Sequence, residues 1–214
     1  MKDISQTFWG MMKVINIPNM FREATLEKIT PEGKFIFSFI NKLLDSYSNG
    51  RRLEKNGICL FGVSRAGKTH TVYGIQKYVD SMKGVPKVAV IASKKIINAI
   101  KLSFKFDSEF DSELEKLQKR EAVDFLEDIK VYPGFVIIDD IGTEKFTEAI
   151  ISEYHEIINE RYQQLRSTSF TTNHNPTSLT EAVGSRIFSR INSMCELVEF
   201  KNAYQGINNI PENK

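Results

Sequence analysis

Short β-favouring runs alternate with amphipathic stretches along this chain. Runs rich in apolar and β-branched residues predict buried strands at residues 57–62, 87–91, 135–138, 168–172 and 196–200. Between them, helical spacing of apolar residues predicts helices over about 31–47, 68–78, 94–102, 148–165 and 179–191. The acidic segment 107–128 predicts one or two solvated helices, and Ser93 is an expected helix cap. Alternating strands and helices predict an α/β fold, in which a five-stranded parallel sheet is flanked by helices.

Composition narrows the class of protein. The 214 residues carry 29 basic and 27 acidic side chains, which argues against a globally basic nucleic-acid binder but allows a local basic surface. Cys59 and Cys195 lie far apart among apolar residues, so buried thiols are expected rather than a disulfide or a zinc site. The sequence shows neither a secretory signal pattern nor an apolar run near the ~20 residues that span a bilayer. A cytoplasmic protein without membrane contact is expected.

A phosphate-binding motif follows the first predicted strand and opens the next helix. It reads Gly62-Val63-Ser64-Arg65-Ala66-Gly67-Lys68-Thr69, followed by His70. Glycines in this G-x-x-x-x-G-K-[ST] pattern let backbone N–H groups face the phosphates, and the helix adds its positive N-terminal end. Lys68 is expected to reach the β and γ oxygens, and the Thr69 hydroxyl to ligate Mg²⁺. The motif predicts binding of ATP or ADP with Mg²⁺.

Arg65 occupies a position in this motif where many relatives carry another glycine. A side chain there restricts the backbone. Arg65 could place a cation beside the phosphates, or it could point outward.

A second acidic element follows about 70 residues later, at the end of the strand over 135–138. Ligand sites of parallel sheets lie beyond the carboxyl ends of the strands. Asp139 is therefore expected near Mg²⁺, and Asp140 is expected to polarise the attacking water.

The motifs together resemble AAA+ helicase loaders of the DnaC/DnaI type and IstB-like transposition helpers. Gly67-Lys68-Thr69-His70 resembles the family's Walker A ending, and Asp139-Asp140-Ile141-Gly142-Thr143-Glu144 resembles its Walker B segment. Ile157-Ile158-Asn159-Glu160-Arg161-Tyr162 resembles the end of the helix after Walker B, and Thr171-Thr172-Asn173 resembles sensor 1. Gly184-Ser185-Arg186-Ile187-Phe188-Ser189-Arg190-Ile191 resembles box VII, and all these segments occur in the family's order. Ile17-Pro18, Phe21 and Ala24-Thr25-Leu26-Glu27 resemble the entry to the family's ATPase core. The resemblance implies an AAA+ domain over 17–206 without a C-terminal helical lid, followed by a tail over 207–214 that is expected to be flexible. The chain departs from the family in having only a short extension over 1–16 where helicase loaders usually carry a separate N-terminal domain.

The resemblance also implies catalytic roles. Asn173 would hold the lytic water or the γ-phosphate, although it could simply satisfy a turn. Arg190 would be an arginine finger that acts on the neighbouring subunit, and Arg186, one helical turn earlier, would assist. Either arginine could instead form a surface ion pair. A finger in trans implies slow, switch-like ATP hydrolysis in a homo-oligomer.

Partners follow from the same resemblance and from one basic stretch. A replicative helicase is the implied partner, and Met1–Pro18 could contact it or pack on the core. Single-stranded DNA could bind a segment rich in lysine and phenylalanine, at Lys94, Lys95, Lys101, Phe104 and Lys105, whose lysines could equally be a solvated helix face. An IstB-like helper is the alternative function. A P-loop kinase is a weaker alternative because no arginine-rich lid is found in the sequence. A GTPase is not favoured because the sequence has no Asn-Lys-x-Asp motif after a strand.

Overall fold

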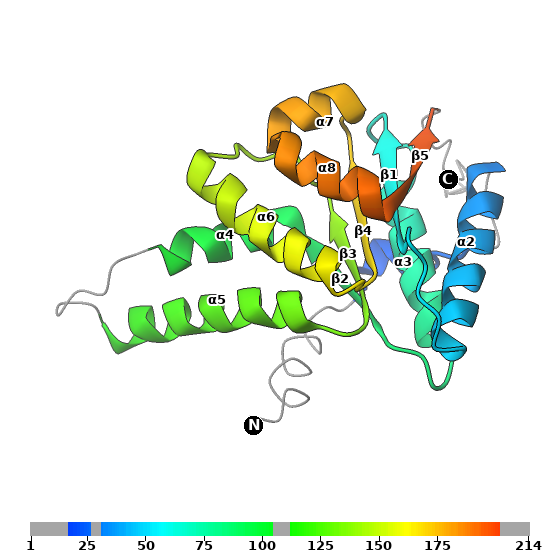
Figure 1. The fold of residues 1–214 in the computed structure, drawn as a ribbon, viewed down its shortest axis with the longest axis horizontal. Coiled ribbons are helices and arrows are strands. Elements are labelled where there is room, and N and C mark those ends of the chain that lie inside the picture. Colours follow the sequence, from blue (N-terminus) through cyan, green and yellow to red (C-terminus); the bar gives the residue numbers. More distant parts are fainter. Residues whose placement is uncertain (1–16, 27–30, 105–111, 202–214) are drawn as a thin grey trace, which may run out of the picture.

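The computed structural model describes residues 17–26, 31–104 and 112–201 as a sheet of five parallel strands with helices on both faces (Figure 1). The strands are β1 (Gly57–Gly62), β2 (Val88–Ala92), β3 (Phe135–Asp139), β4 (Thr168–Thr172) and β5 (Cys195–Phe200). Their spatial order is β2-β3-β4-β1-β5. The predicted α/β fold with a five-stranded parallel sheet is confirmed.

The helices form two layers, and each layer has its own core. One face of the sheet packs against α2 (Pro31–Ser48) and α3 (Lys68–Asp80). The other face packs against α4 (Ser93–Ser103), α5 (Glu113–Val131), α6 (Glu148–Gln163), α7 (Pro176–Val183) and α8 (Ser185–Met194). A short 3₁₀ turn, η1 (Asn19–Phe21), precedes them. Burial on both faces explains why the strands read as nearly continuous apolar runs.

Two local predictions are wrong. The single helix expected over 179–191 is two helices, because Gly184 lies between α7 and α8 with φ 88°. That left-handed region suits glycine and interrupts helical geometry. Ser93 does not cap α4 with its side chain. It lies inside the helix, buried, with its hydroxyl 2.9 Å from the hydroxyl of Tyr154 on α6.

The order of the strands places a crevice between β1 and β4. The chain leaves β1 through α3 on one face of the sheet, whereas it leaves β4 through α7 and α8 on the other. In open α/β sheets such a switch point, at the carboxyl ends of the strands, is where ligands bind. The phosphate-binding motif follows β1, and Asn173 follows β4, so both lie at this crevice.

The remaining expectations divide by region. Both cysteines are free and buried, as predicted. None of the helices within the described ranges is long and apolar enough to cross a membrane. The extension over 1–16, the tail over 207–214 and Lys105 lie outside the described residues, as does the segment in which the absence of a helical lid was expected.

Candidate nucleotide-binding site

Two glycines shape the loop between β1 and α3. Gly62 has φ 132°, and a Cβ there would lie 2.2 Å from the carbonyl oxygen of Phe200 on the neighbouring strand β5. Gly67 has φ 93° and precedes the first residue of α3. Both positions therefore require glycine, and the loop reaches the N-terminus of α3, where unpaired backbone N–H groups favour an anion.

Lys68 is the first residue of α3, and its side chain turns back under the loop. Its ammonium Nζ donates to the carbonyl oxygens of Gly62 at 2.9 Å and Val63 at 2.8 Å, and to Asn173 Oδ1 at 2.9 Å. The lysine is 7% exposed. Its charge is therefore held at the bottom of the loop, next to the tip of β4.

The candidate metal ligands come from α3 and β3. Thr69 Oγ1 lies 3.4 and 3.5 Å from the two carboxylate oxygens of Asp139. Thr171 Oγ1 donates to Asp139 Oδ1 at 2.5 Å, which fixes the carboxylate against β4. The chemistry and spacing of this pair fit Mg²⁺, an ion that takes one or two protein oxygen ligands at about 2.1 Å together with waters and phosphate oxygens. Within the described residues no cluster of three His, Cys, Asp or Glu side chains forms an alternative metal site.

Asp140 follows in a strained conformation. Its φ is 61°, a left-handed value that is uncommon for aspartate, and its backbone N–H donates to Thr171 Oγ1 at 2.8 Å. Its carboxylate accepts a bond of 3.1 Å from Asn173 Nδ2. The amide of Asn173 thus bridges Asp140 and Lys68, and Asp140 itself is exposed toward solvent.

The pKa values of Lys68 and Asp139 are both shifted toward the uncharged form. Burial lowers the pKa of Lys68, although Asp140 and then Asp139 oppose that change. Burial is also the main reason why the pKa of Asp139 is raised, with Asp140 adding repulsion and the Thr171 hydroxyl opposing both. An anion beside Lys68 and a cation beside Asp139 would relieve these costs. The electrostatics therefore fit a phosphate group bound together with a divalent ion.

These side chains line a cleft of about 430 Å³, within the usual range for small-molecule sites. Its lining comes from η1, the loop, α3 and the tips of β3 and β4, namely Met20, Phe21, Ser64, Arg65, Ala66, Gly67, Lys68, Thr69, His70, Asp139, Asp140, Thr171 and Asn173. Phe21 stacks on Tyr73 with ring centroids 4.8 Å apart and meets His70 edge-on at 6.5 Å. This aromatic group gives one end of the cleft an apolar wall.

Arg65 belongs to the cleft lining and is exposed. Its φ of 60° is the left-handed value that a glycine would adopt without strain. Both alternatives for its side chain, beside the phosphates or pointing outward, stay predictions.

The structure separates the two box VII arginines from this cleft. Neither Arg186 nor Arg190 belongs to its lining. Arg190 donates from Nε to Asn159 Oδ1 at 2.9 Å and lies over the ring of Tyr162, both on α6. Arg186 is exposed, in a hollow between α6 and α8 that includes His155. Their roles stay predictions, and within one chain they face a different surface.

Three cleft residues were not assigned a role from the sequence. Thr171 could have been found, since a buried hydroxyl on β4, the strand that pairs with the strand ending in Asp139, needs a polar partner. Met20 and Phe21 come from η1, far from the motif in sequence; the resemblance names Phe21 in the entry to the ATPase core but gives it no place in the cleft. Their place depends on the packing of Phe21 against α3.

The basic segment on α4 is less uniform than its sequence suggests. Lys95 lies over the ring of Phe125 at 4.9 Å, and Lys94 is 3.8 Å from the carboxylate of Glu144. Lys101 and Phe104 are exposed at the end of the helix. Two of these lysines therefore have intramolecular partners. The side chains available to a ligand lie at the C-terminal end of the helix.

Comparison with known proteins identifies the fold. No family model and no curated protein matches this sequence. Among solved structures, the DnaC helicase loader superposes with a TM-score of 0.64 at 22% identity, covering 85% of this chain and 98% of that one. DnaI gives 0.65 at 18% identity, covering 87% and 92%. The replication initiator DnaA bound to AMPPCP and single-stranded DNA gives 0.62 at 19% identity, covering 83% of this chain and 50% of DnaA. The resemblance in fold to DnaC/DnaI-type AAA+ proteins is confirmed, and the IstB-like alternative stays a prediction.

Proposed function

We propose that this protein is an ATP-dependent accessory ATPase of DNA replication, similar in action to the replicative helicase loaders. One observation carries the proposal: Asn173 connects Lys68 to Asp140 at the switch point of the sheet, beside the Thr69–Asp139 pair. A phosphate-binding cation, a metal-binding pair and a carboxylate that can face water thus share one cleft. That is the set of groups that nucleoside triphosphate hydrolysis needs.

Each group has a chemical task in this proposal. Lys68 exchanges its backbone carbonyl partners for the β and γ oxygens of ATP. Thr69 and Asp139 would hold Mg²⁺, which would neutralise charge on the phosphates. Asp140 accepts a hydrogen bond from the attacking water, and Asn173 keeps Asp140 oriented. Phe21 and Met20 would contact the base or ribose at the apolar end of the cleft.

The arginine finger is proposed to come from a second copy of the chain. The basic side chains of the cleft, as far as the structure describes it, are Arg65, Lys68 and His70. Arg190 lies on α8 and is bonded to α6 outside that cleft, so in this proposal it reaches the γ-phosphate of a neighbouring chain across an interface. Hydrolysis therefore requires an oligomer, and the ATPase acts as a slow switch between assembled and released states.

Paired variants test this proposal directly. Arg190→Ala keeps the phosphate site but is expected to lose roughly 10³-fold in kcat, the usual contribution of a finger. Lys68→Ala keeps Arg190 but loses ATP binding. Mixing the two inactive chains should restore hydrolysis, because each supplies what the other lacks. Full activity of Arg190→Ala alone would contradict the trans arrangement.

Single-stranded DNA is the proposed nucleic-acid partner, with contacts at the end of α4. Lys101 supplies charge and Phe104 an exposed ring on which a base can stack. Lys101→Ala is expected to weaken binding of an oligothymidylate and to reduce its salt dependence, whereas Lys95→Ala, whose ammonium already faces Phe125, should change it less. Fluorescence anisotropy at several salt concentrations distinguishes the two.

The macromolecular partner is proposed to be a hexameric helicase. Co-purification from the native host with a helicase supports the loader function, and co-purification with a transposase would instead support an IstB-like helper.

A further inference from the structure

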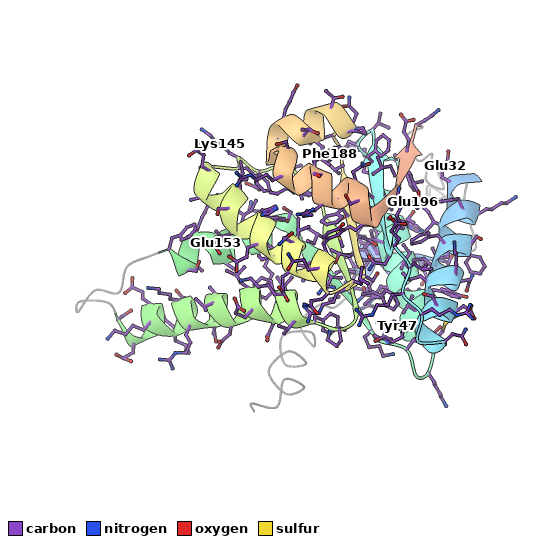
Figure 2. The ribbon with its side chains drawn as sticks, in the orientation of Figure 1. Glu32, Tyr47, Lys145, Glu153, Phe188 and Glu196 are labelled. Carbon is purple, nitrogen blue, oxygen red and sulfur yellow. The ribbon has the colours of Figure 1, made fainter. Side chains whose placement is uncertain are left out.

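The α6–α8 surface holds Arg190 in an unusual way. The two helices lie side by side (Figure 1), and Phe188 on α8 and Glu153 on α6 mark them in Figure 2. Asn159 and Tyr162 are three residues apart on α6, so they share one face of that helix. Asn159 Oδ1 accepts from Arg190 Nε at 2.9 Å, and the Tyr162 ring lies 4.9 Å from the guanidinium carbon.

Both contacts leave the reactive end of the arginine available. The hydrogen bond uses Nε, and neither Nη1 nor Nη2 donates to any residue that the structure describes. The partners are also neutral, an amide and a phenol ring, so no carboxylate cancels the positive charge. The two terminal amino groups form the fork that binds phosphate oxygens in a bidentate manner.

The nearby arginine provides a contrast. Arg186 lies one turn earlier on α8, is exposed, and forms no hydrogen bond or ion pair with the described residues. A free arginine loses side-chain entropy when it is fixed on a ligand. Arg190 has already lost part of that freedom, because one side is bonded and one face is stacked.

We propose that Asn159 and Tyr162 are positioning residues, which hold Arg190 with its charged fork directed out of its own chain for the phosphate of a neighbouring one. The inference rests on the proposed action of Arg190 in trans. It adds that α6, the helix after the acidic element, acts in the subunit that donates the finger, where it positions Arg190.

A donor–acceptor mixture isolates this role. The acceptor chain is Arg190→Ala, which has an intact phosphate site and no finger. Donor chains all carry Lys68→Ala, so they cannot hydrolyse ATP, and differ only in a second change at the clamp. Because the acceptor's α6 is native, any difference in activity reports the donor's Arg190 alone.

The second changes are chosen to separate positioning from stability. Asn159→Ala and Tyr162→Leu each remove one contact, and donors with them are expected to rescue kcat about tenfold less well, with KM for ATP unchanged. Tyr162→Phe keeps the ring and should rescue like the simple donor. Gln163→Ala, an exposed neighbour on the same helix, is the matched control. Thermal unfolding of each donor confirms that it is folded.

Asn159→Asp gives a readout that a structural role would not move. The carboxylate accepts the same bond from Nε but neutralises the guanidinium, so the donor should be as stable as the native chain and still rescue poorly. Full rescue by the Asn159→Ala and Tyr162→Leu donors would overturn the positioning role and leave the finger in place. Failure of the simple Lys68→Ala donor to rescue would overturn the trans finger itself, and the positioning role with it.

Discussion

The two ends of the sheet use buried charge in opposite ways. At the amino end, Arg161 of α6 is fully buried and every part of its guanidinium is bonded. Nε donates to Thr168 Oγ1, Nη1 to the carbonyls of Ile129 and Tyr132, and Nη2 to those of Gly134 and Ser167, at distances of 2.7 to 3.3 Å. Burial lowers its pKa to about 9, which still leaves it charged at neutral pH.

At the carboxyl end the charges are left incompletely compensated. Lys68 has two carbonyls and an amide as partners, and Asp139 has hydroxyls, while both pKa values are shifted against the charged form. Arg65 and Asp140 add positive φ angles. Arg161 therefore stabilises the packing of α5, α6 and β4 against one another. The cleft, by contrast, carries an unfavourable free energy of buried charge and backbone strain that a ligand can relieve.

Loss of Arg161 should have the largest effect on the fold. Arg161→Met has similar length but removes five donated hydrogen bonds from a buried site, which we expect to cost about 3–5 kcal/mol of unfolding free energy or to prevent folding altogether. Urea unfolding followed by circular dichroism measures it. Arg166→Met, at a partly exposed neighbour, should cost much less. An unfolding free energy close to that of the native chain would show that Arg161 does not stabilise the amino end of the sheet.

Asp139→Asn should separate activity from stability. Hydrolysis is expected to fall at least about 10²-fold, because the proposed Mg²⁺ ligand is lost. The pKa of Asp139 is raised above its unfolded value, so its ionised form costs stability at neutral pH, and that cost disappears as the pH falls through the raised pKa. The asparagine variant should therefore melt higher than the native chain at pH 7.5, with a difference that narrows on acidification. Scanning calorimetry from pH 7.5 down toward the ordinary aspartate pKa of about 4 checks this, and a lower melting temperature at pH 7.5 would contradict it.

The contrast between the two ends also shows what sequence patterns can reach. The strands and the phosphate loop were predicted because their signals are local: an apolar run, then glycines and a lysine at fixed spacing. The place of Asp139 and Asp140 beside the loop followed from the rule that ligand sites lie at the carboxyl edge of a parallel sheet, and that of Asn173 from the family resemblance. Those positions need no knowledge of side-chain packing.

Arg161 shows where sequence patterns stop. A charged residue in an amphipathic helix is usually exposed, and its burial depends on carbonyls from two loops and the end of α5, which no local pattern brings together. The Ser93–Tyr154 bond also depends on tertiary packing. Sequence resemblance named Arg186 and Arg190 together, and only the structure distinguishes the clamped arginine from the free one.

Thr171→Val should produce an intermediate effect at the carboxyl end. The variant keeps the size of the side chain but removes the donor to Asp139 and the acceptor for the Asp140 N–H. We expect a loss of about 1–3 kcal/mol in unfolding free energy and a lower kcat, because both carboxylates lose their support. Thr171→Ser, which retains the hydroxyl, is the matched control. Equal stability and kcat of Thr171→Val and the native chain would remove Thr171 from the site.

Arg65 offers the smallest and most specific test, because its backbone and its charge can be changed separately. Arg65→Gly relieves the φ of 60°, so we expect about 0.5–1 kcal/mol of added stability. Arg65→Ala keeps the strain and removes only the cation, so its stability should match that of the native chain. If the guanidinium faces the phosphates from its place in the cleft lining, both variants raise the KM for ATP by the same roughly two- to threefold factor. A KM that rises in neither variant would assign Arg65 to solvent, and the strain at this position would then belong to the loop alone.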